Sequence, residues 1–132
     1  GYAAYPLMAA YLTQSDVVVN SFVRKAPQSI VTKIGDYLAS AKPMINTGMG
    51  PEFRGKVDHD RFGVNIEPVV PQILADAILK LHDDPALSAQ MGARARAIAE
   101  EQFDRSESYQ RIVALIDRLI AENEAKRAQE RG

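Results

Sequence analysis

The sequence lacks several features that would assign a protein to a functional class directly. None of its 132 residues is cysteine, which excludes disulfide bonds, a cysteine nucleophile and a zinc site built on thiolates. The net charge is only −1, so the basic surface typical of nucleic-acid-binding proteins is not expected. No apolar run approaches the roughly 20 residues of a membrane span, and no signal-peptide pattern precedes the first helix. We therefore expect a cytoplasmic α or α/β protein that binds no nucleic acid.

Three short apolar runs predict the strands of a parallel sheet. They cover residues 16–20, 43–47 and 63–66, and their apolar character is continuous, which is typical of strands buried on both faces. Between the second and third runs we expect a loop at 48–51 and no helix, with the charged triplet 58–60 exposed in a loop. His59 in that triplet has no second ligand at a helical spacing, so a metal site is not predicted.

Amphipathic patterns predict helices around these strands. Helical spacing is found at 7–12, 29–40, from 71 and from 85, and a last helix begins at Asp104. The order of strands and helices, with short connections, predicts an α/β fold in which crossover helices join parallel strands. Three strands leave one sheet edge unpaired, so we also expect self-association through that edge.

The most informative segment is the predicted helix 29–40. Ser29, Thr32, Lys33 and Asp36 recur at helical spacing and share one face. A helix N-terminus capped by Ser29, with Lys33 one turn inside, suits a phosphate group. Asp36 lies about 10 Å from Ser29 along the axis, a separation that fits a nucleotide. The alternative from spacing alone is that these side chains form the solvated face of an ordinary amphipathic helix.

A family resemblance rests on the order of several motifs. They are Ser15-Asp16-Val17-Val18-Val19, then Ser29-xxx-Lys33-xx-Asp36-Tyr37-Leu38-Ala39-xx-Lys42-Pro43, and finally Ala75-Asp76-Ala77-Ile78, Asp83-Asp84-Pro85 and Met91-Gly92. Together they resemble the nucleotide-sugar-binding half of the group 1 (family 4) glycosyltransferases, over about residues 7–120. Ala41 stands where that family has a glycine.

The resemblance implies a Rossmann-like parallel sheet, as part of the carboxy-terminal domain of a GT-B enzyme. It implies that a nucleoside diphosphate sugar is the donor for retaining transfer to an acceptor hydroxyl, as in polysaccharide biosynthesis, with no metal or other cofactor. The start of the helix, Ser29 and Ile30, would bind the diphosphate, and Asp36 the ribose hydroxyls. Lys33 matches a lysine found in part of the family. Gln28 stands where the family has an acid, although it carries no charge.

The expected organisation is a partial domain over residues 1–120 and a charged helical tail over 121–132. The amino-terminal acceptor domain of the family has no counterpart in the sequence, so this chain alone is expected to be inactive, and no catalytic residue is assigned. In the full-length enzyme, a peripheral position at the membrane is an alternative to a free cytoplasmic one. Gln28 favours a non-catalytic nucleotide-binding or interaction module as the alternative function, and a nucleotide-sugar epimerase of the same fold is a third.

Overall fold

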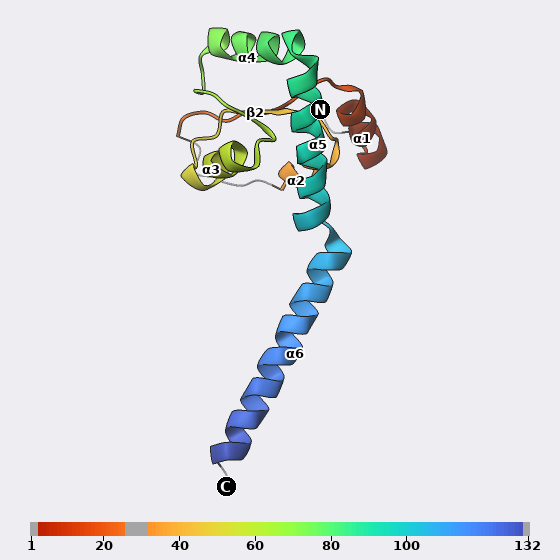
Figure 1. Cartoon of the computed structure of the whole chain (residues 1–132), viewed down its shortest axis with the longest axis vertical. Helices are drawn as coiled ribbons and strands as arrows, with labels where there is room; N and C mark the ends of the chain where they lie inside the picture. The colour runs from red at the N-terminus through yellow and green to blue at the C-terminus, as the bar shows by residue number, and fades with distance from the viewer. Residues whose placement is uncertain (1–2, 26–31, 131–132) are drawn as a thin grey trace. The chain divides into compact units, whose positions relative to one another are not determined.

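The computed structural model describes residues 3–25 and 32–130 and divides into two units, residues 1–100 and 101–132. Alternating helices and strands make up the first unit, and a long helix makes up most of the second (Figure 1). The elements in chain order are α1 (Tyr5–Gln14), β1 (Val18–Asn20), α2 (Ile34–Ala39), β2 (Met44–Asn46), α3 (Pro51–Asp60), β3 (Gly63–Asn65), α4 (Pro71–Asp83), α5 (Pro85–Gln102) and α6 (Arg105–Glu130).

The three predicted strands form one parallel sheet in the order β1-β2-β3. Val18 pairs with Met44 and Met44 with Gly63, so the strands end at the same level. Each strand is one or two residues shorter than its apolar run. The predicted α/β arrangement of parallel strands and crossover helices is confirmed.

Helices cover both faces of the sheet, which explains the continuous apolar character of the strands. In Figure 1, α4 lies on one side of β2, and α2 and α3 lie on the other. On the α2 and α3 face, the buried residues are Val18, Ile34, Leu38, Met44, Phe53, Val57, Phe62, Ala95, Ile98 and Ala99. On the α4 face, the buried residues are Ile45, Ile66, Ala77 and Leu81.

Residues 48–50 form the predicted loop, but helix α3 follows from Pro51, where no helix was predicted. Pro51 occupies the first turn, where its missing N–H costs nothing. Phe53 and Val57, four residues apart, are buried against the sheet. His59 lies in the last turn of α3 and not in a loop. With only two apolar contacts in ten residues, this helix depends on packing and gave little periodic signal.

Helix α2 also differs from the prediction. The structure begins it at Ile34, with Thr32 and Lys33 in a turn, so Lys33 is the N-cap residue and does not lie one turn inside. β-Branched Thr32 and Gly35 both lower the helix propensity at this end. Residues 29–31 of the predicted helix lie outside the described residues.

The predicted caps of the last two helices are confirmed. Asp84 Oδ1 accepts a hydrogen bond of 2.9 Å from the N–H of Leu87, and Asp104 Oδ1 accepts one of 3.0 Å from the N–H of Glu107. In the second unit, the large apolar side chains of α6 are about half exposed. They are Tyr109, Ile112, Val113, Leu115, Ile116, Leu119 and Ile120. None of the helices in the described part combines the length and hydropathy needed to cross a membrane.

Candidate functional site

A cavity of about 270 Å³ opens at the carboxyl ends of the strands. In open α/β sheets, ligands bind in the crevice outside these ends. The walls are mainly apolar, with a few polar groups from the segments that follow the strands. The lining residues are Val19, Ser21, Phe22, Thr47, Ile66, Glu67, Val69, Val70, Pro71 and Leu74.

Thr47 joins the segments that follow β1 and β2. Its hydroxyl accepts a hydrogen bond of 2.6 Å from the N–H of Phe22 and lies 3.0 Å from the Phe22 carbonyl oxygen, to which it donates. The backbone N–H of Thr47 donates to the carbonyl of Asn20 over 3.1 Å. These bonds hold the Phe22 ring at the cavity wall and give the site a fixed floor.

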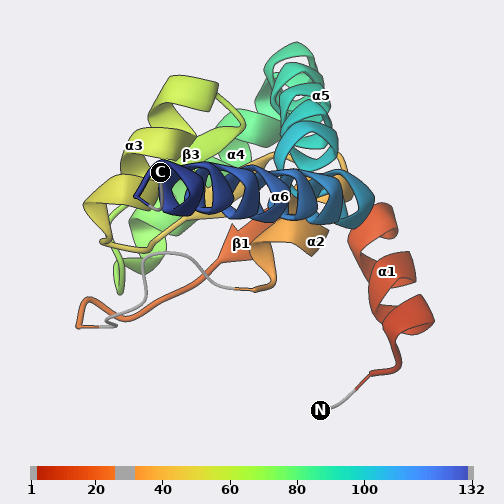
Figure 2. The ribbon, with the colours of Figure 1, turned by 90° about the horizontal axis from the view of Figure 1, so that it is seen from below.

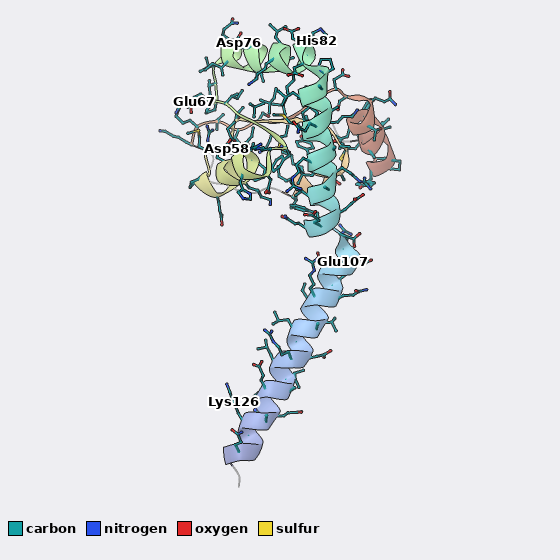
Figure 3. All side chains as sticks on the ribbon, in the orientation of Figure 1. Asp58, Glu67, Asp76, His82, Glu107 and Lys126 are labelled. Atoms are coloured by element: carbon teal, nitrogen blue, oxygen red, sulfur yellow. The ribbon has the colours of Figure 1, made fainter. Side chains whose placement is uncertain are left out.

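Glu67 is the one carboxylate among the described residues that line this cavity, and two arginines lie near it. Arg24 Nη2 is 3.1 Å from a Glu67 oxygen, and Arg54 Nη2 is 4.0 Å from the other. The Arg24 and Glu67 side chains are 60% and 43% exposed, so their ion pair contributes little to stability. Both groups can therefore exchange this contact for a ligand. Glu67 is labelled in Figure 3 on the segment between β3 and α4.

Arg54 is held more firmly than Arg24. Its Nη1 atom donates to the carbonyl oxygens of Gly48 and Ile66, over 3.3 and 3.2 Å. These acceptors belong to the segments after β2 and β3, so one guanidinium from α3 ties the two ends of the strands together. The result is a fixed positive charge next to Glu67.

Val69 lines the cavity with a strained backbone. Its φ of 65° lies in the left-handed region, which is unusual for a β-branched residue, and its side chain is 77% exposed. Such strain costs roughly 1–3 kcal/mol and concentrates at ligand sites. The observation adds to the evidence that this cavity is functional.

Lys33, a predicted site residue, contacts the ring of one residue of the cavity wall, Phe22, and does not itself line the cavity. Its ammonium nitrogen lies 5.4 Å from the centre of the Phe22 ring and 5.3 Å from that of Tyr37. Both distances suit cation–π interactions. Phe22 also lines the cavity, so its ring is in contact with both the cavity and the Lys33 ammonium group.

Asp36 is directed to a different neighbour. It lies in the first turn of α2, half-buried, and its Oδ1 accepts a hydrogen bond of 3.3 Å from the Tyr5 hydroxyl of α1. None of its described contacts is to a residue that lines the cavity. The other predicted site residues, Gln28, Ser29 and Ile30, lie outside the described residues, so the diphosphate contacts stay predictions.

Sequence reasoning missed Thr47, Arg54 and Glu67. Thr47 and Glu67 could have been found, because Thr47 is the last residue of the predicted strand 43–47 and Glu67 directly follows the predicted strand 63–66. Arg54 could not, because its helix was not predicted.

A shifted pKa is found away from the cavity, at Asp60. A hydrogen bond from Lys56 lowers the pKa of Asp60 below its usual 3.8, with a smaller contribution from His59, and partial burial opposes the shift. Lys56 Nζ is 2.7 Å from Asp60 Oδ2, and His59 is 87% exposed. These groups stabilise the end of α3. Across the described residues, no three acidic or histidine side chains gather as a metal site would require.

Comparisons with known proteins concern the fold. No protein-family model and no curated protein matches the chain. Alr3699/HepE of Anabaena, solved in complex with UDP, matches 81% of this chain with a TM-score of 0.69 and 24% identity. The same protein in complex with UDP-glucose gives a TM-score of 0.67 at the same identity and coverage. Sucrose-phosphate synthase of Thermosynechococcus elongatus matches 92% of this chain with a TM-score of 0.74 and 21% identity.

The shared region is a part of each matched protein. This chain spans 29–30% of the length of these structures. The comparisons therefore confirm the predicted fold, and the chain has the α/β fold of a part of the GT-B glycosyltransferases.

Proposed function

We propose that this chain is the donor-binding part of a glycosyltransferase and binds a nucleoside diphosphate sugar. The observation that supports this proposal most is the cavity at the carboxyl ends of the strands. The fold is shared with a protein that was solved with UDP and with UDP-glucose. Its apolar walls suit a flat base or a sugar face, and the charged groups at its rim suit a diphosphate.

Positive charge for the diphosphate has three described sources. Lys33 lies beside Phe22, and Arg24 and Arg54 contact Glu67 at a cavity wall. With Ser29 and Ile30, Lys33 would neutralise the charge that develops on the departing diphosphate. Such electrostatic stabilisation is the main contribution that a transferase of this kind requires. Asp36 would accept the ribose hydroxyl hydrogen bonds in place of its contact with Tyr5.

We also propose that the sugar is transferred to an acceptor hydroxyl with retention of its anomeric configuration. The acceptor and the remaining catalytic groups would come from an amino-terminal domain outside this chain. One observation favours a second function: uncharged Gln28 occupies the position of the family's acid, which fits a module that binds the donor without turning it over.

Calorimetric titration of the full chain with UDP, GDP, UDP-glucose and pyrophosphate tests the proposal. We expect Asp36→Asn to weaken UDP binding by about tenfold, because a neutral amide accepts fewer and weaker ribose bonds. Pyrophosphate has no ribose and should bind both forms alike. The melting temperature should hardly change, since the amide oxygen of the substituted side chain can still accept the hydrogen bond from Tyr5.

Matched variants separate the site from general charge effects. Lys33→Gln should weaken the binding of UDP and of pyrophosphate by the same factor. Lys80→Gln and Asp83→Asn, at exposed residues of α4, are the controls and should change neither affinity. If the wild-type chain binds no nucleotide at millimolar concentration, the proposed function is wrong. Binding without sugar transfer after the missing domain is restored would favour the non-catalytic module.

A further inference from the structure

A second cavity, of about 350 Å³, lies at the opposite end of the sheet, where the strands begin. Its lining comes from the segments that precede β1 and β2, from the last turn of α4 and from the start of α5. It therefore belongs to the half of the sheet that contains the edge strand β1 (Figure 2). The proposed function does not use this cavity, because the donor would bind where the strands end.

Close packing fixes the walls of this second cavity. Helix α5 passes the segment before β2 at Gly92, where a Cβ atom would overlap the carbonyl oxygen of Ala41. One turn further along α5, Arg96 Nη1 donates to the carbonyl oxygen of Ala39 over 3.0 Å. Pro43 and Leu81, which form part of the lining, are buried. The cavity is thus a feature of the packed fold and not a gap between loose loops.

Two opposite charges line this cavity without pairing. Asp16 stands two residues before β1, and Lys42 stands two residues before β2. The strand register pairs Val18 with Met44, so these two positions are neighbours. The N–H of Val18 donates to the carbonyl oxygen of Pro43 over 3.0 Å, which keeps the two segments adjacent before the strands begin. Opposite charges on neighbouring strands usually attract each other into contact, yet no ion pair joins Asp16 and Lys42 in the described part of the chain.

Two further polar side chains line the cavity. His82 lies in the last turn of α4, where Figure 3 labels it, and Ser88 lies in the first turn of α5. Among the residues that the structure describes, neither side chain forms a hydrogen bond. The cavity therefore offers a ligand an ammonium group, a carboxylate, an imidazole and a hydroxyl group, none of which has to give up a partner.

The geometry points to a small ligand that carries both charges. We propose that this cavity is a second binding site, for a free α-amino acid with an aliphatic side chain. Its carboxylate would contact Lys42 and His82, and its ammonium group would contact Asp16, in charge-assisted hydrogen bonds. The aliphatic side chain would lie against the apolar part of the lining, which includes Pro43 and Leu81. An α-amino acid holds its two charges close together, as the neighbouring positions of Asp16 and Lys42 require.

Other classes of ligand fit this cavity less well. Asp16 would repel a simple anion such as phosphate, and Lys42 would repel a simple cation. A nucleobase would find no aromatic ring among the described residues that line the cavity, and a neutral sugar would leave both charges unpaired. The proposal goes beyond donor binding and does not depend on it, because the two cavities share no lining residue.

An NMR titration of the isotope-labelled full chain with three probes tests the proposal. The probes are L-leucine, leucinamide, which lacks the carboxylate, and isocaproate, which lacks the ammonium group. Leucine should shift the backbone resonances of Asp16, Lys42 and Ser88. It should also bind about tenfold more tightly than either analogue, because each analogue leaves one charge of the cavity unpaired.

Two variants should each remove one of these preferences. Asp16→Asn removes the partner of the ammonium group, so it should bind leucine and isocaproate with nearly equal affinity. Lys42→Gln should bind leucine and leucinamide with nearly equal affinity, whereas Lys42→Arg keeps the charge and should keep the preference. Asp83→Asn and Lys80→Gln, at exposed residues of α4 outside the cavity, are the matched controls and should bind all three probes as wild type does.

Several results would overturn the proposal. Equal binding of the three probes to wild type, or no shift at millimolar concentration, would remove the amino-acid site, as would preferences that survive in Asp16→Asn and Lys42→Gln. Tighter binding of glucose or of phosphate than of leucine at these residues would assign the cavity to a sugar or to an anion instead. UDP should not displace leucine, and competition between the two would contradict a separate site. Failure of UDP to bind would leave the leucine result unchanged, so the two proposals are tested separately.

Discussion

Ala41→Gly should stabilise this protein, although glycine usually destabilises when it replaces alanine. Ala41 follows the end of α2 with a φ of 58°, in the left-handed region. Its N–H donates to the carbonyl of Leu38 over 3.2 Å and closes the last turn of the helix. This is the position at which helices most often carry glycine. It is also the position where the glycosyltransferase family has one, so the structure gives that glycine a physical reason.

The expected magnitude follows from two opposing effects. Left-handed backbone costs an alanine about 1–2 kcal/mol because Cβ approaches the following carbonyl oxygen. Glycine removes that strain but gives the unfolded chain more freedom, which costs about 0.4–1 kcal/mol. Ala41 is exposed, so little packing is lost with its methyl group. The net gain in the free energy of unfolding should be roughly 0.5–1 kcal/mol.

Urea denaturation followed by circular dichroism measures this change. The midpoint for Ala41→Gly should rise with an unchanged slope, since the surface exposed on unfolding stays the same. Ala75→Gly is the matched control, because Ala75 is exposed in the interior of α4. There the same substitution should cost about 1 kcal/mol. If Ala41→Gly lowers stability as Ala75→Gly does, the left-handed strain at Ala41 is refuted.

Two further predictions concern stability. Gly63→Ala should lower the free energy of unfolding by about 2 kcal/mol or more in urea denaturation, because a Cβ atom there would overlap the backbone carbonyl of Met44. A Cβ atom at Gly55 in α3 would have no atom within 4 Å, so Gly55→Ala should instead stabilise the protein by roughly 0.5–1 kcal/mol. If the two substitutions changed the free energy of unfolding equally, the packing of β3 on β2 would be contradicted. The lowered pKa of Asp60 means that its carboxylate stabilises the fold above the usual pKa of 3.8, and this stabilisation is lost as the pH falls through the lower folded value. Asp60→Asn should therefore reduce stability at pH 7, and the difference from wild type should shrink at low pH. A difference that is independent of pH would be the contrary result.

Local sequence determined most of the elements of this fold. The three continuous apolar runs became the three strands, and Asp84 and Asp104 cap the helices they were predicted to cap. These features were predictable because they depend on a few neighbouring residues: a buried strand must be apolar on both faces, and a cap bonds the N–H three residues ahead. The alternation of strands and helices then implied a parallel sheet.

Only the tertiary structure decided which distant residues meet. Asp36 accepts a hydrogen bond from Tyr5, 31 residues away, and the Lys33 ammonium group lies over the ring of Phe22. Helix α3 forms because Phe53 and Val57 pack against the sheet. The ten residues of the helix have no amphipathic pattern that would have predicted it.

The last residues of the three strands, Asn20, Asn46 and Asn65, are joined by side-chain hydrogen bonds across the sheet and show the same division most clearly. In the sequence, Asn20 ends its apolar run, and Asn46 and Asn65 each stand one residue before the end of theirs. Asn20, Asn46 and Asn65 are separated by 26 and 19 residues, and no periodicity relates those numbers. Their alignment follows from strand register, which is fixed when both faces of the sheet are buried at once, and burial on that scale is a property of the folded chain.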